Sequence, residues 1–89
     1  MTRYRASGDA LAATLSDGAV LLHLHTKRYF SLNESGTRIW ELLQRESGVD
    51  EIVSALVGEF DVPAAEARAA VEGLIAELLD ERLIEAAAP

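Results

Sequence analysis

The sequence has no cysteine, few prolines and no long apolar run. Without cysteine the chain has no disulfide, no thiol nucleophile and no thiolate metal ligand, which is consistent with a reducing compartment. No segment reaches the roughly 18–20 uninterrupted apolar residues that span a bilayer, and the first residues lack the apolar stretch of a secretory signal. We therefore predict a soluble, cytoplasmic protein with no membrane partner.

Positive charge is also scarce, because eight Lys and Arg face fifteen Asp and Glu, giving a net charge of −7. Proteins that bind nucleic acid gain much of their affinity from basic side chains on phosphates. The acidic balance predicts instead a basic or neutral partner, such as a peptide that carries Lys or Arg. A nucleic-acid partner is not expected.

The signatures of enzymes are absent as well. Nothing resembles a nucleophile elbow or a phosphate-binding glycine loop, and the carboxylates gather on expected helix surfaces. The 89 residues predict a single domain over residues 1–89, with its core at about 11–84, which leaves little room for a buried active site. We expect no catalytic residue, no cofactor and no metal ion.

The first third of the chain has the alternating pattern of strands. We predict three antiparallel strands over residues 11–16, 19–25 and 28–32, the last at an edge of the sheet. Asp17-Gly18 predicts a type I′ hairpin turn with positive φ, and Thr26-Lys27 predicts the next turn. The second strand has one fully apolar face, formed by Val20, Leu22 and Leu24. The third has Phe30 and Leu32 on one face, and Tyr29 and Ser31 on the other.

The remainder has helical spacing. Asn33 is the expected N-cap of a helix that runs to about Glu46, with an inner stripe formed by Ile39, Trp40 and Leu43. We interpret Trp40 as a core residue rather than a ligand platform. A second helix is predicted over residues 49–59. Asp61 is the expected cap of a third, with Pro63 in its first turn. Leu83-Ile84 should pack back on the core, and the tail over residues 86–89 should fray.

The third helix has an unusually wide apolar stripe. At 100° per residue its large apolar side chains cover an arc of roughly 140°, wider than a surface helix needs. One interpretation is that part of the stripe faces the core and part lines an open groove. The stripe consists of Val71, Leu74, Ile75, Leu78 and Leu79, extended by the small residues Ala67 and Ala70. Taken together, the elements predict an α+β fold of winged helix-turn-helix type, a three-stranded antiparallel sheet followed by three helices.

Two features of the strands have more than one interpretation. His23 and His25 share a predicted strand face and could form half of a metal site, but no third ligand is near, so we interpret them as two solvent-facing side chains. Residues 28–32 form an edge strand, which either Lys27 and Arg28 protect by charge or an extended peptide joins as a further strand. The residues alone leave these two alternatives equal.

A resemblance to a known family favours the second alternative. The segments 17–22, 28–33 (Arg-Tyr-Phe-Ser-Leu-Asn) and 36–43 (Gly-Thr-Arg-Ile-Trp-Glu-Leu-Leu) resemble the PqqD family, as do residues 60–62 and 78–84. The resemblance covers about residues 11–84. It implies a recognition element that binds the leader segment of a ribosomally made precursor peptide between the third strand and the third helix.

Within that family, the chain is most similar to the stand-alone form of lasso-peptide biosynthesis, which delivers the leader to a separate, transglutaminase-like leader peptidase. The resemblance implies that a leader would pair with the strand formed by Arg28, Tyr29, Phe30, Ser31 and Leu32. It implies a helical wall formed by Ala67, Ala70, Val71, Leu74, Ile75 and Leu78. Many relatives carry an aspartate where this chain has Ala70, so a charge for a basic leader residue would come from Glu66, Glu77 or Glu81.

Three alternatives remain open. One is the chaperone of the pyrroloquinoline quinone precursor, which belongs to the same family. Another is a winged-helix DNA-binding regulator, although the segment 49–59 carries no Lys or Arg. The last is a dimerising structural module.

Overall fold

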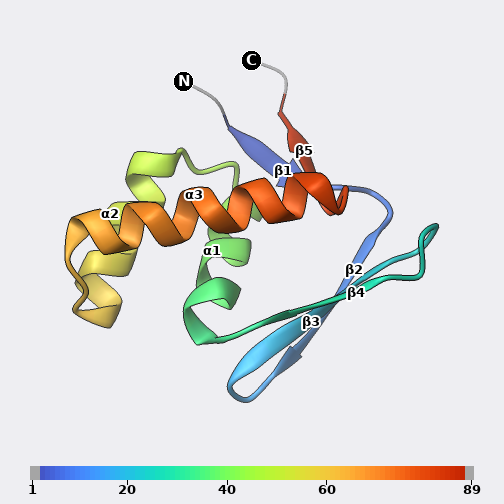
Figure 1. Cartoon of the computed structure of the whole chain (residues 1–89), viewed down its shortest axis with the longest axis horizontal. Helices are drawn as coiled ribbons and strands as arrows, with labels where there is room; N and C mark the ends of the chain where they lie inside the picture. The colour runs from blue at the N-terminus through green and yellow to red at the C-terminus, as the bar shows by residue number, and fades with distance from the viewer. Residues whose placement is uncertain (1–2, 88–89) are drawn as a thin grey trace.

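The computed structural model describes residues 3–87, which form a three-stranded sheet, a two-stranded sheet and three helices (Figure 1). In chain order the elements are β1 (Tyr4–Ala6), β2 (Ala10–Leu15), β3 (Gly18–His23), β4 (Tyr29–Leu32), α1 (Glu34–Gln44), α2 (Val49–Phe60), α3 (Ala64–Asp80) and β5 (Ile84–Ala86). The larger sheet is antiparallel with the order β2-β3-β4, so β4 lies at an edge. The predicted fold class and the predicted edge strand are therefore confirmed.

The smaller sheet, β1 paired with β5, was not predicted. Tyr4 lies opposite Ala86 and Ala6 opposite Ile84, and the Ala87 N–H donates to the Arg3 carbonyl at 2.8 Å. The predicted fraying of the tail is thus wrong as far as Ala87, whereas Ala88 and Pro89 lie outside the described residues. Strands of three residues carry little periodicity, and their partner lies at the other end of the chain, so no local pattern marks them.

The helices cover the face of β3 that contains Ala19, Leu21 and His23, all buried. The fully apolar face that includes Val20 and Leu22 points away from them and is only partly buried. Alternation shows that a strand has two faces, but the packing of the helices decides which one is buried.

The turn between β2 and β3 also differs from the prediction. Leu15 lies opposite Gly18, so Ser16 and Asp17 form the loop, and neither Asp17 nor Gly18 has a positive φ. The type I′ prediction is therefore wrong. Glycine is needed at position 18 for another reason, because a Cβ there would collide with the carbonyl oxygen of Leu32 on β4.

The helix boundaries follow the sequence with one correction. Asn33 caps α1, and its Oδ1 accepts from the Gly36 N–H at 2.8 Å, as predicted. Asp61 does not cap α3: it ends α2 in the left-handed conformation, φ 53° and ψ 47°, and Pro63 occupies the N-cap of α3. The predicted core position of Trp40 is confirmed, because only 4% of it is exposed.

No helix among residues 3–87 has both the length and the apolar character that crossing a bilayer requires.

Candidate functional site

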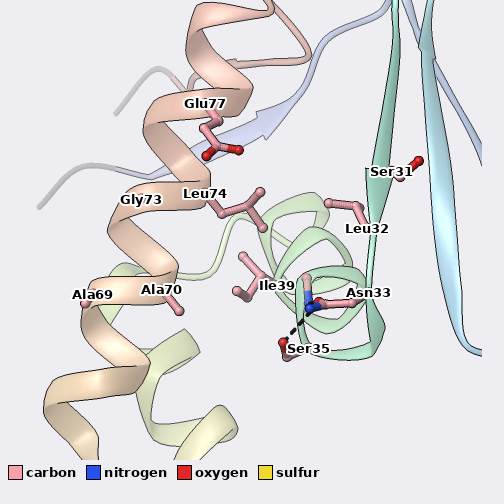
Figure 2. Close-up of a pocket in the computed structure, with 11 residues that line it drawn as sticks. Ser31, Leu32, Asn33, Ser35, Ile39, Ala69, Ala70, Gly73, Leu74 and Glu77 are labelled. Atoms are coloured by element: carbon pink, nitrogen blue, oxygen red, sulfur yellow. Dashed lines mark hydrogen bonds between the residues drawn. The ribbon is translucent and has the colours of Figure 1, made fainter.

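A cleft of about 380 Å³ lies between β4 and α3. Figure 2 shows Leu32, Ile39 and Leu74 reaching into it from the strand, from α1 and from α3, while Ser31 points away. Ile39 and Leu32 are buried and form its apolar base. The residues that line it are Ser31, Leu32, Asn33, Ser35, Gly36, Ile39, Ala69, Ala70, Gly73, Leu74 and Glu77. The cleft therefore combines an exposed strand edge with a helical wall.

The backbone of β4 is arranged to accept another strand. The His23 N–H donates to the Arg28 carbonyl at 3.0 Å, which fixes the alternation of the β3–β4 ladder. The backbone groups of Phe30 and Leu32 then face β3, and those of Tyr29 and Ser31 face the free edge. The strand is held from one side only, and its other side borders the cleft.

The helical wall is low because its residues are small. Ala69, Ala70 and Gly73 face the cleft, and a Cβ on Gly73 would meet no atom within 4 Å. Leu74 is half-buried at the base of this wall, and Glu77 places a carboxylate at the same side (Figure 2). The absence of bulk on α3 leaves room for the side chains of a ligand.

The structure brings some of the sequence-predicted helical residues to the cleft and not others. Ala70 and Leu74 line it, whereas Val71 and Leu78 are fully buried, and Ala67 and Ile75 are at most 5% exposed in the core. The wide stripe is thus divided, since three of its large residues pack inward and Leu74 turns to the cleft. The four buried residues support the wall from behind.

The predicted strand residues are divided in a similar way. Leu32 and Ser31 line the cleft, Phe30 is half-buried against the core, and Tyr29 is 73% exposed. Arg28 precedes the strand, and its guanidinium lies 2.9 Å from the Glu81 carboxylate, just beyond α3. Of the three acidic residues considered for charge pairing, Glu81 is therefore engaged within the chain.

Sequence reasoning missed Ala69, Gly73 and the residues at the start of α1. Positions 70, 73, 74 and 77 follow the i, i+3, i+4, i+7 spacing of one helix face, so extending the period from Ala70 would have found Gly73 and placed Glu77. The contribution of Asn33, Ser35 and Gly36 has no such signal. It follows from the way α1 begins directly after β4, with Asn33 capping the helix.

A second, apolar pocket of about 230 Å³ adjoins the cleft and shares Ser35 and Ala70 with it. Phe60 and Val62, where α2 leads into α3, form its far side, and Glu66 lies at its rim. The remaining residues that line it are Leu56 and Ala67. A chain lying in the cleft would reach this pocket past the N-terminus of α1.

Two arginines of the helices, Arg38 and Arg68, form ion pairs within the chain and do not line the cleft. Arg38 donates to Glu59 at 2.9 Å, and this hydrogen bond holds the pKa of Arg38 above its ordinary value. Arg68 donates to Asp50 at 2.6 Å, and its pKa is raised in the same way. Glu77 has no ion-pair partner among residues 3–87. The Glu77 carboxylate at the cleft is thus available to a ligand, as is that of Glu66 at the adjoining pocket.

The ring centroids of His23 and His25 lie 6.1 Å apart, but the two side chains differ in exposure. β3 ends at His23, which is only 6% exposed, so the prediction of two solvent-facing side chains is wrong for it. Its Nδ1 accepts from the His25 N–H at 3.1 Å and from the Thr26 N–H at 3.3 Å. His23 thus closes the β3–β4 turn. Among the described residues, no three side chains of His, Asp or Glu gather where they could hold a metal ion.

Comparison with known proteins gives a family match over most of the chain. The sequence model of the family described as coenzyme PQQ synthesis protein D (PqqD) matches residues 18–84, which include both walls of the cleft. No curated protein matches the chain.

Two solved structures have the same fold. TbiB1 in complex with the TbiA(beta) leader peptide is 33% identical, with a TM-score of 0.85 over 96% of this chain and 99% of that one. Lasso peptide synthetase B1 complexed with the leader peptide is 20% identical, with a TM-score of 0.84 over 93% of this chain and 98% of that one.

Proposed function

Because the chain belongs to the PqqD family, we propose that it is a leader-binding recognition element of lasso-peptide biosynthesis and not an enzyme. The observation that carries this proposal is the cleft between β4 and α3, where a free strand edge faces a low helical wall. The likeness to TbiB1, which was solved with a leader peptide, supports it.

The leader binds as a fourth strand, antiparallel to β4. The outward-facing backbone groups of Tyr29 and Ser31 exchange hydrogen bonds with it and set its register. Alternate side chains of an extended peptide point to opposite sides, so every second leader residue enters the cleft. Leu32, Ala70 and Leu74 contact these side chains directly. The other residues predicted from the resemblance hold the two walls in place. They are Arg28, Phe30, Ala67, Val71, Ile75 and Leu78.

A bulky apolar residue of the leader, aromatic in our proposal, is the anchor. The small residues of α3 leave space for it, and a buried aromatic side chain in a pocket is the usual centre of binding energy. Glu77 stands at the rim of the cleft and pairs with a basic residue of the leader, as the aspartate of many relatives would from the position of Ala70.

Bound in this way, the leader is delivered by proximity. A domain that holds the leader and contacts a transglutaminase-like leader peptidase raises the local concentration of the scissile segment at that enzyme. Ribosomal precursors are available where they are synthesised, so we place this exchange in the cytoplasm.

The family to which the chain belongs, coenzyme PQQ synthesis protein D, favours a second candidate, a chaperone for the pyrroloquinoline quinone precursor. Both candidates use the same cleft, and they differ in the peptide that binds. Titration of the domain with one leader of each kind separates them, because the tighter complex identifies the pathway.

The experiment that tests strand addition is a proline at Ser31, with binding of a fluorescent lasso-precursor leader followed by anisotropy. The Ser31 N–H faces the free edge, so proline removes a donor for the leader while the β3–β4 ladder keeps its bonds. We expect Ser31→Pro to lose at least about tenfold in affinity, about 1.4 kcal/mol. Ser31→Ala should bind normally.

Thr14→Pro is the matched control, because it introduces proline at the opposite edge of the same sheet. Circular dichroism checks that each variant is folded. A folded Ser31→Pro protein that binds the leader as tightly as the wild type would overturn strand addition.

A further inference from the structure

The opposite edge of the sheet, β2, has none of the features that normally protect an edge strand. Its six residues, Ala10 to Leu15, include no charge and no proline, and five of the six are exposed. Natural proteins usually protect such edges with lysine, proline or a covering segment. Among the described elements β2 packs chiefly on β3. The edge is therefore open and apolar.

The backbone of β2 offers free hydrogen-bonding groups at two positions. The His23 backbone N–H points to the β4 side, so the groups of Val20 and Leu22 point to β2 and engage Ala13 and Leu11. The groups of Ala12 and Thr14 then face outward. They have no backbone partner among residues 3–87, whereas the Ala10 N–H already donates to the Ser7 carbonyl at 3.1 Å.

We propose that β2 pairs with β2 of a second copy of this chain around a two-fold axis at Ala13. The sequence is self-complementary in this register. Ala13 meets Ala13, Leu11 meets Leu15 on the same face, and Ala12 meets Thr14. Ala12 of one copy and Thr14 of the other then form a hydrogen-bonded pair on each side of the axis. The Ala13–Ala13 pair lies between these two pairs and has no hydrogen bonds, as the antiparallel alternation requires.

The outer face of the sheet supports this arrangement. Leu11 and Leu15 are 54% and 55% exposed, and they share a face with the partly buried Val20 and Leu22. Pairing in the proposed register places leucine against leucine at both ends of the new contact and continues the apolar face across the two copies. Neither strand places a charge at the junction.

The resulting six-stranded sheet leaves both β4 edges at its outer ends. The two β4 strands would lie about 24 Å apart at the usual spacing between neighbouring strands. Each copy keeps its cleft, so the dimer presents two clefts on one rigid sheet. The contact joins only six residues of each copy, so we expect a weak dimer that depends on concentration.

Sedimentation velocity over a range of concentrations tests the proposal. The wild type should move from monomer to dimer as its concentration rises, and Ala13→Lys should stay monomeric because two like charges would meet at the axis. Thr14→Pro should also stay monomeric, since it removes an outward donor. The Ala13→Lys protein should bind a leader peptide normally, which separates this proposal from the leader-binding function.

The absence of cysteine allows a second test of the register. Ala13→Cys introduces one thiol, and opposite residues in a pair without hydrogen bonds are about 4.5 Å apart between Cα atoms, within reach of a disulfide. Ala12→Cys is the matched control, because its symmetry mate lies diagonally, at about 7–8 Å. Mild oxidation should therefore cross-link the first variant much faster.

A wild type that is monomeric at every concentration, or equal cross-linking of the two cysteine variants, would overturn the proposal. The proposal would also be overturned if the wild type never self-associates and Ala13→Lys abolishes binding to a leader peptidase. The edge would then belong to that enzyme and not to a second copy.

Discussion

The guanidinium of Arg28 lies 2.9 Å from the carboxylate of Glu81, and this ion pair joins the start of β4 to the end of α3. These two elements are the walls of the cleft. The Glu81 side chain is 21% exposed, whereas that of Arg28 is 67% exposed, so only the carboxylate of this pair is sheltered. The contact therefore bridges the two walls between the start of the strand and the residue just after the helix.

The first prediction concerns this ion pair. Arg28→Glu should weaken leader binding several-fold while changing the free energy of unfolding by only about 0–1 kcal/mol, because exposed ion pairs contribute little to stability. The charge-reversed double variant, Arg28→Glu with Glu81→Arg, should recover most of the affinity. Calorimetric titration with a leader peptide measures the affinity of each variant. If the double variant binds no better than the single one, the pair does not set the width of the cleft.

The second prediction fills the cleft from the helix. A Cβ on Gly73 would meet nothing within 4 Å, so Gly73→Leu should fold normally and occupy the space of the anchor residue. Leader affinity should fall by about tenfold or more, about 1.4 kcal/mol. Gly58→Leu is the matched control, since Gly58 is also an exposed, unobstructed helical glycine but lies on α2 outside the cleft. Equal affinities of the two variants would place the leader elsewhere.

The third prediction tests the charge at the rim. Glu77→Lys should weaken binding of a leader with basic residues by about threefold to fivefold, as expected for an exposed ion pair. Higher salt should reduce the difference between the variant and the wild type. Glu72→Lys makes the same change of charge on α3 away from the cleft. Fluorescence anisotropy at two salt concentrations measures the affinity of each variant for the leader. An unchanged affinity of the Glu77→Lys protein would exclude an ion pair between Glu77 and the leader.

The fourth prediction concerns Gly18. Any Cβ at this position collides with the Leu32 carbonyl, so Gly18→Ala should destabilise the fold by about 1–3 kcal/mol. Gly8→Ala should be close to neutral, because a Cβ there meets nothing within 4 Å. Urea denaturation followed by circular dichroism compares the two. Similar midpoints would mean that β4 shifts freely away from β3.

The fifth prediction is a dependence on pH. The Glu51 carboxylate accepts from the Gly48 N–H at 2.8 Å and from Arg3 at 3.0 Å, and these bonds, the Gly48 bond first, lower the pKa of Glu51 below its ordinary value of 4.5. A lowered pKa in the folded state stabilises the fold above pH 4.5, and this contribution is lost as the pH falls through the lowered value.

Glu51→Gln should therefore be less stable than the wild type at neutral pH, and the two should converge in acid. Thermal unfolding across a pH series measures the difference. A gap that persists unchanged at the lowest pH would show that the carboxylate charge is not its source.

The sequence by itself determined the order of the main elements and excluded thiol chemistry. The alternation of 28–32, the Asn33 cap and the 3.6-residue period of α3 are local signals, and local hydrogen bonding and side-chain spacing decide them. The absence of cysteine and the acidic balance likewise required no structure.

Tertiary packing decided what no local signal contains. It buried Ala19, Leu21 and His23 rather than the fully apolar face of β3, and it paired β1 with β5 across the length of the chain. It also divided the stripe of α3, turning Val71 to the core and leaving Leu74 and Ala70 at the cleft. The physical reason is that a pattern specifies which faces an element has, while only the neighbouring elements decide which face meets the core, a ligand or the solvent.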